Sequence, residues 1–135
     1  FANAKELKDF ASARITGQQN TFHYTVIDQM EGVAKQTPLE NFPAMIVALS
    51  SGRIDGYISE RPGAISASMS NPDLTFVAFE EGKGFQHDPD FTTIAVGLQK
   101  GSTLMEKVNE ALASLDNETR EKMMVEAIAN QPLSE

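Results

Sequence analysis

Apolar residues along the first part of the chain follow strand spacing and then helix spacing. After a helix predicted over residues 3–11, Ala13 and Ile15 stand two positions apart, as on one face of a strand. The next apolar residues fall at i, i+4, i+5 and i+8, which places them on one helix face: Phe22, Val26, Ile27 and Met30. A weak strand is then expected over residues 31–37.

The alternation of helix and strand patterns continues to about residue 70. Asn41 is a favourable N-cap for a helix that Gly52 ends. The buried stripe of this helix is predicted to be Phe42, Met45, Ile46 and Leu49. Residues 53–60 predict a strand of about five residues, and a short helix with Pro62 near its first turn follows.

Two apolar runs in the second half of the chain predict further strands. Residues 74–79 ("LTFVAF") are almost continuously apolar, which is typical of a strand covered on both faces. Ile94, Val96 and Leu98 alternate with other residues at strand spacing. The polar, glycine-containing segment between these runs is expected to be a loop.

The pattern changes to two helices near the C-terminus. Thr103 and Glu106 have the spacing of a capping box, and Asp116 and Asn117 separate two helical patterns. Strands alternating with helices predict an α/β fold, with a mainly parallel central sheet flanked by helices. The last two helices are predicted to form a C-terminal helix–turn–helix appendage.

Composition narrows the classes of function. The chain of 135 residues has a net charge of −8, which argues against a nucleic-acid partner because phosphates require a basic surface. It contains no cysteine, which excludes disulfides, thiolate catalysis and cysteine–zinc sites. The sequence also lacks the run of about 20 apolar residues that a membrane-spanning helix needs.

Three motifs, in this order, resemble the second lobe of the extracellular solute-binding proteins of bacterial amino-acid ABC importers. They are "LKDF…ARITGQQNT" from residue 7, "NFPAMIVALSSGRIDGYISERP" over 41–62 and "AVGLQKGSTLMEKVNEALASL" over 95–115. The resemblance covers about residues 5–130 and implies the type II periplasmic-binding-protein fold.

The resemblance also implies a domain organisation. Residues 1–98 would form the second ligand-binding lobe, and residues 99–135 would be returning helices that pack on a first lobe. That first lobe would lie outside this chain. Because the returning helices would then lack their partner, the isolated chain is expected to dimerise, which light scattering would test.

Members of this family bind an amino acid between two lobes without catalysis. The resemblance therefore implies a non-enzymatic chain that needs no cofactor and no metal. It implies an extracytoplasmic location, in the periplasm or at the cell surface, with membrane anchoring through a part not present here. The implied partners are a polar amino acid, the first lobe and the membrane permease of the importer.

The segment "GQQNTFHY" (17–24) is the first candidate for a ligand site. It joins a predicted strand to a predicted helix, at the sheet edge where α/β proteins bind ligands. By the resemblance, Thr21 and the Phe22 N–H contact the ligand carboxylate and Gln18 lines the cleft. Asn20 either faces the ligand or holds Thr21 in place. The alternative is an ordinary helix cap, for which Asn and Thr are common.

Glu60 is the second candidate, because it ends a predicted strand at the same edge. By the resemblance it contacts the ligand α-ammonium through a charge-assisted hydrogen bond, a type that contributes roughly 1.5–3 kcal/mol. The alternative is an exposed carboxylate that pairs with Arg61 or stabilises the N-terminus of the next helix.

The two histidines are assigned no ligand role. A surface or packing position is favoured for His23. His87, Asp88 and Asp90 occur together, but no second cluster has the spacing of metal ligands, so a solvated loop is favoured over a metal site.

Other functions are compatible with the same architecture. One is the amino-acid sensory domain of a signalling receptor, and another is an interaction module that binds no small molecule. A third is an enzyme resembling dehydratases or lytic transglycosylases, which would need a general acid/base pair near the cleft. Only Glu60 and His23 qualify for such a pair, and the sequence shows no obvious partner for either.

Overall fold

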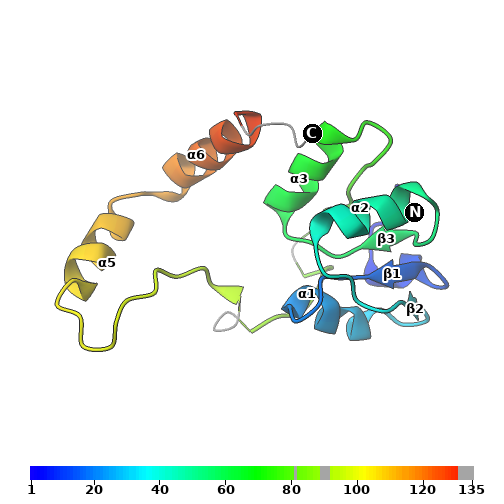
Figure 1. Ribbon diagram of the computed structural model, residues 1–135, viewed down its shortest axis with the longest axis horizontal. Helices are drawn as coiled ribbons and strands as arrows, with labels where there is room; N and C mark the ends of the chain where they lie inside the picture. Colours follow the sequence, from blue (N-terminus) through cyan, green and yellow to red (C-terminus); the bar gives the residue numbers. More distant parts are fainter. Residues whose placement is uncertain (81, 89–91, 131–135) are drawn as a thin grey trace. The chain divides into compact units, whose positions relative to one another are not determined.

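The computed structural model describes residues 1–80, 82–88 and 92–130, and the chain divides into two compact units (Figure 1). The first unit spans Phe1–Thr92 and the second Thr93–Glu135. The sheet and both candidate site segments belong to the first unit. The assignment of residues 1–98 to a ligand-binding lobe stays a prediction.

The first unit contains a small sheet of three parallel strands in the order β2-β1-β3. The strands are β1 (Arg14–Thr16), β2 (Ala34–Lys35) and β3 (Gly56–Tyr57). In the register, Ile15 lies beside Lys35 of one neighbour and Gly56 of the other. A parallel sheet with flanking helices agrees with the predicted α/β class at this coarse level, although β3 is shorter than the predicted strand.

Helices connect the strands on both sides of the sheet. Besides the strands, the described part of the first unit contains η1 (Leu7–Phe10), α1 (Phe22–Thr25), η2 (Val26–Gln29), α2 (Phe42–Ser50) and α3 (Arg61–Ser70). The chain moves from β1 to β2 through α1 and η2, then returns past β1 to β3 through α2. One connection leads from β1 to one neighbouring strand, and the next leads back across β1 to the other. Right-handed connections that run in opposite directions along a sheet place their helices on opposite faces. Figure 1 shows α2 above the strands.

Local sequence signals explain where α2 and α3 begin and end. The Asn41 side chain accepts a hydrogen bond of 3.0 Å from the Ala44 N–H, which confirms the predicted N-cap. After α2, Gly52 adopts the left-handed conformation (φ +69), which only glycine enters without a steric cost. Pro62 lies in the first turn of α3, where a missing N–H breaks no helical hydrogen bond.

The predicted helix after residue 21 is two short helices, α1 and the 3-10 helix η2. Thr25, Val26 and Ile27 are three consecutive β-branched residues, which lower helix propensity at the point where the geometry changes. Val26 and Ile27 are buried as predicted, whereas Phe22 is 41% exposed. The core cluster joins this segment to β1 and consists of Ala13, Ile15, Ile27 and Met30.

Two predicted strands do not form. Residues 74–79 and 93–99 contain neither helix nor strand. None of residues 74–79 is buried, and Ile94 is 95% exposed. An apolar run becomes a strand only where it can pair with another strand, and in the described part of the chain neither run pairs with the sheet.

Over residues 93–130, the second unit contains the helices α5 (Met105–Ala113) and α6 (Asn117–Ala129). The Asp116 side chain caps α6 by accepting a hydrogen bond of 2.8 Å from the Thr119 N–H. Leu104 occupies the N-cap position of α5 without a capping side chain, so the predicted capping box of Thr103 and Glu106 is wrong. Among the described residues, no helix is both long and apolar enough to span a bilayer.

Candidate functional site

The two segments predicted to bind a ligand lie at the same edge of the sheet. Thr21 is the N-cap residue of α1, which follows β1, and Glu60 is the N-cap residue of α3, which follows β3. Because β1 and β3 are parallel neighbours, their carboxyl ends meet at one edge. The segments are joined there by His23, whose Nε2 lies 2.8 Å from Oε2 of Glu60.

His23 is the buried member of this contact. Its side chain is 11% exposed, whereas that of Glu60 is 51% exposed. Neither ring nitrogen of His23 makes an aligned hydrogen bond within the described residues, so the Glu60 contact has ion-pair distance without hydrogen-bond geometry. Burial lowers the pKa of His23, and the Glu60 carboxylate offsets this only in part. The ring is therefore mainly neutral at pH 7.

Glu60 interacts with His23 rather than with the neighbouring arginine. Among the described residues, the ion pair that Glu60 forms is the one to His23, which contradicts the alternative of pairing with Arg61. The Glu60 side chain also makes no capping hydrogen bond to α3. Half of its surface therefore remains available to a solute.

Gly17 allows α1 to approach β1 closely enough to position His23. A Cβ atom at Gly17 would lie 2.9 Å from both the His23 carbonyl oxygen and the Tyr24 amide nitrogen. Glycine is therefore required for a close approach of two backbone segments. The Phe22 ring lies beside the His23 ring, with centroids 4.2 Å apart.

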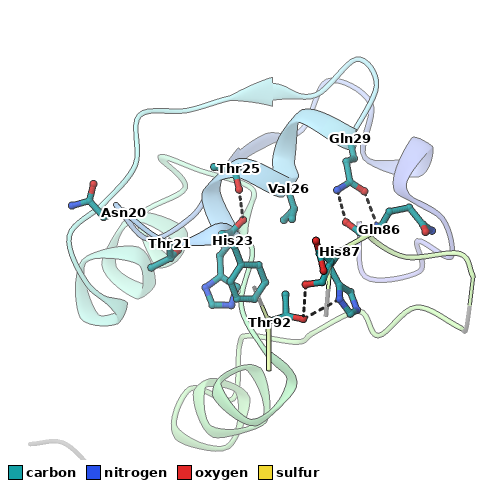
Figure 2. Close-up of a pocket in the computed structure, with 11 residues that line it drawn as sticks. Asn20, Thr21, His23, Thr25, Val26, Gln29, Gln86, His87 and Thr92 are labelled. Carbon is teal, nitrogen blue, oxygen red and sulfur yellow. Dashed lines mark hydrogen bonds between the residues drawn. The ribbon is translucent and has the colours of Figure 1, made fainter. Parts of the chain in front are cut away.

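The polar residues before α1 have specific partners. The Gln18 side-chain amide donates a hydrogen bond of 3.1 Å to the Glu40 carbonyl, and Thr21 Oγ1 donates one of 2.8 Å to the Gln18 carbonyl. The Thr21 hydroxyl therefore does not cap α1, contrary to the simple helix-cap alternative. Asn20 adopts the left-handed conformation (φ +61), and its side chain lies apart from the other labelled residues in Figure 2.

These hydrogen bonds determine which groups of the predicted residues are available to a ligand. The Thr21 hydroxyl proton already has an acceptor, so Thr21 would approach a carboxylate through its backbone N–H. The Gln18 side chain ties the turn before α1 to Glu40, which follows β2. Asn20 shapes the same turn through its left-handed backbone conformation. The structure thus brings Thr21, Phe22 and Glu60 to one edge and gives Gln18 and Asn20 supporting positions.

A hollow of about 700 Å³ adjoins α1 (Figure 2). One wall is formed by α1 and η2 and the other by residues 86–88 and Thr92. Both histidines of the chain line it. The hollow therefore combines imidazole, amide and hydroxyl groups next to the predicted carboxylate-binding residues.

Reciprocal hydrogen bonds hold the second wall to η2. The Gln29 side-chain amide donates to the Gln86 carbonyl and accepts from the Gln86 N–H, each over 2.7 Å (Figure 2). His87 Nδ1 lies 3.0 Å from Thr92 Oγ1, and Asp90 lies outside the described residues. Within the residues that the structure describes, no group of three His, Cys, Asp or Glu side chains could hold a metal ion.

The Gly-Arg-x-Asp motif at 52–55 stabilises the sheet. The Asp55 carboxylate accepts hydrogen bonds from Arg14 Nε (2.9 Å), Nη2 (2.6 Å) and backbone N–H (2.8 Å). These hydrogen bonds lower the pKa of Asp55 to about 2. Arg14 Nη1 also donates to the Arg53 carbonyl over 3.0 Å. The motif thereby fixes the start of β3 against β1.

From the sequence, a packing or surface position was favoured for His23 over a role in the cleft; the ring is buried and also contacts Glu60. The signal that was available is its place two residues after Thr21, at the edge to which Glu60 was also assigned. Gly17 was likewise available as a signal for close backbone approach after a strand.

The family resemblance rests on motifs in the sequence, and the geometry above is independent of it. In comparisons with protein-family models, with curated proteins and with solved structures, the chain has no match.

Proposed function

We propose that the Phe1–Thr92 unit is an amino-acid-binding lobe of the substrate-binding component of an ABC importer. The observation that carries the proposal is the 2.8 Å contact between His23 and Glu60. This contact brings the starts of α1 and α3, which the resemblance assigns to the two ends of an amino acid, to one edge of the sheet. The three motifs that resemble the family support the same assignment.

In this proposal the ligand binds through both of its charged groups. Its ammonium pairs with the half-exposed Glu60 carboxylate. Its carboxylate accepts hydrogen bonds from the backbone N–H groups of Thr21 and Phe22, since the Thr21 hydroxyl donates elsewhere. Gln18 and Asn20 support the turn that presents these groups.

The proposed mechanism is closure of two lobes without covalent chemistry. The ligand would stabilise the closed state only through contacts that the open state lacks. The closed form would then be recognised by the membrane permease, outside the cytoplasm. A first lobe, supplied from outside this chain, would provide the remaining contacts.

The test is a titration of the isotopically labelled chain with each of the twenty amino acids, followed by backbone amide NMR. We expect weak binding, with a Kd of about 1 mM or above for one lobe, equivalent to roughly −4 kcal/mol. The signals of Thr21 and Phe22 should shift. Glu60→Gln should weaken binding at least about tenfold, which is the loss of roughly 1.4 kcal/mol.

Glu110→Gln is the matched control, because it makes the same change of charge at an exposed position of α5. It should leave binding unchanged. The proposal is wrong if no amino acid shifts the signals of α1, or if Glu60→Gln binds as tightly as the parent chain.

The contact between His23 and Glu60 also favours a second candidate function, that of an enzyme with this architecture. His23 and Glu60 are each other's partner, and a neutral imidazole beside a carboxylate is suited to general base catalysis. This candidate predicts turnover of a cyclic acid substrate that Glu60→Gln and His23→Gln both abolish. Reversible amino-acid binding without consumption of the ligand favours the receptor instead.

A further inference from the structure

The side chains of His23 and Glu60 differ in how much of their surface is exposed to solvent. His23 is almost fully buried, whereas half of Glu60 is exposed, and one carboxylate oxygen of Glu60 lies 2.8 Å from the ring. The buried ring therefore lies against one side of the carboxylate and leaves the rest of it to a solute.

We propose that His23 is a positioning residue for Glu60, and that a protonated His23 ring competes with the ligand ammonium for this carboxylate. The inference rests on the proposed amino-acid site and adds a regulation of that site by acid. It concerns a residue that the resemblance does not assign.

The proposal places the hydrogen of the neutral ring on Nε2, because a carboxylate oxygen at 2.8 Å would repel a lone pair there. Nδ1 then has a buried lone pair that no hydrogen bond satisfies within the described residues. A second proton would bind at Nδ1 and create a cation whose charge faces Glu60.

Other titratable or charged groups lie on the elements next to this ring. Arg61 follows Glu60 in the chain, and His87 and Asp88 lie on the opposite wall of the hollow. In the described part of the chain, Glu60 is the group within ion-pair distance of His23. The charge of Glu60 therefore favours the protonated ring, although the larger effect of burial opposes it.

Competition follows because both cations use the same carboxylate. An ammonium bound to Glu60 disfavours the imidazolium, and by linkage the imidazolium disfavours the ammonium by the same factor. Affinity should therefore fall as the medium becomes acidic. The fall is at most about tenfold per pH unit, the limit for one linked proton.

The first experiment needs no ligand. The two histidine rings are titrated by NMR in the parent chain and in Glu60→Gln. We expect the midpoint of His23 to move to lower pH in the variant, because the neighbouring negative charge is lost. An unchanged His23 midpoint overturns the inference.

The second experiment compares amino-acid affinity at about pH 7.5 and about pH 5.5, the range in which histidine changes charge. Affinity of the parent chain should fall several-fold at the lower pH. His23→Gln replaces the ring by an amide that does not titrate and should bind with little pH dependence, whereas Glu110→Gln, at an exposed position of α5, should behave like the parent. Circular dichroism at both pH values verifies that each variant is folded.

The outcomes separate the inference from the proposed function. Binding by His23→Gln with the full pH dependence of the parent overturns the role of His23 and leaves the amino-acid site intact. Failure of the parent to bind any amino acid at either pH overturns the proposed function, and the competition with it. In that case the ring titration still measures the coupling of His23 to Glu60.

Discussion

Gly17 packs against the backbone of His23, with room for a hydrogen atom but not for a methyl group. A Cβ atom at Gly17 would lie 2.9 Å from the His23 carbonyl oxygen. Since this contact is to backbone, no side-chain rotation relieves it. The position of α1, and with it that of His23, therefore depends on the absence of a side chain at residue 17.

Gly17→Ala should accordingly lower the free energy of unfolding by about 1–3 kcal/mol, the usual cost of overpacking. Thermal unfolding followed by circular dichroism measures the change. Gly97→Ala is the control, because a Cβ atom there meets nothing within 4 Å. Equal midpoints for both variants would contradict the close approach of α1 to β1.

Asp55→Asn should lower stability near neutral pH and make stability less dependent on acid. In the folded chain the pKa of Asp55 is lowered from 3.8 to about 2, so its contribution to stability is complete above about pH 3.8 and disappears as the pH falls to about 2. The effect is moderate, since both partners are partly exposed. Acid titrations monitored by circular dichroism should show a smaller loss of stability in this window for Asp55→Asn. Asp73→Asn, at an exposed position, should retain the behaviour of the parent.

His23 should make stability depend on pH in a separate window. Its pKa in the folded chain is lowered below 6.5, so the unfolded chain binds the proton more readily. The free energy of unfolding should therefore decrease as the pH falls from about 6.5 toward the folded pKa. Urea unfolding at a series of pH values should show this decrease in the parent and in His87→Gln. A parallel decrease in His23→Gln would assign it to another group.

Gln29→Met should release the segment around Gln86 from η2. The substitution keeps the approximate length of the side chain but removes two hydrogen bonds of 2.7 Å, each worth about 0.5–1.5 kcal/mol. Because the loss is local, it should appear as faster amide exchange of the Gln86 N–H rather than as global unfolding. Gln19→Met, at another exposed position, should not change that exchange rate.

The elements of the fold that the sequence predicted correctly are those with local signals. Asn41 caps α2 through a residue three positions away, and Pro62 needs only its own ring geometry to favour the first turn of α3. Residues 74–79 lacked such a signal. Their apolar character was compatible with a strand, but strand formation requires a pairing partner, which a local pattern does not contain.

The candidate site likewise has a part that could be predicted from the sequence and a part that could not. Thr21 and Glu60 could be assigned to one sheet edge because parallel topology alone places them there. The contact of His23 with Glu60, and that of Arg14 with Asp55, depend on the close packing of segments distant in sequence. Such distances follow from the three-dimensional fold and are not encoded in residue spacing.

The central position of β1 also constrains the order in which the chain can assemble during synthesis. β1 emerges first, but its partners on the two edges are β2 and β3, which end at Lys35 and Tyr57. A nascent chain that stops before β3 leaves one edge of β1 unpaired and Arg14 without Asp55. Such edges are prone to pair with other chains. We therefore expect ribosome-bound intermediates to become resistant to protease only after α2 and β3 have left the exit tunnel.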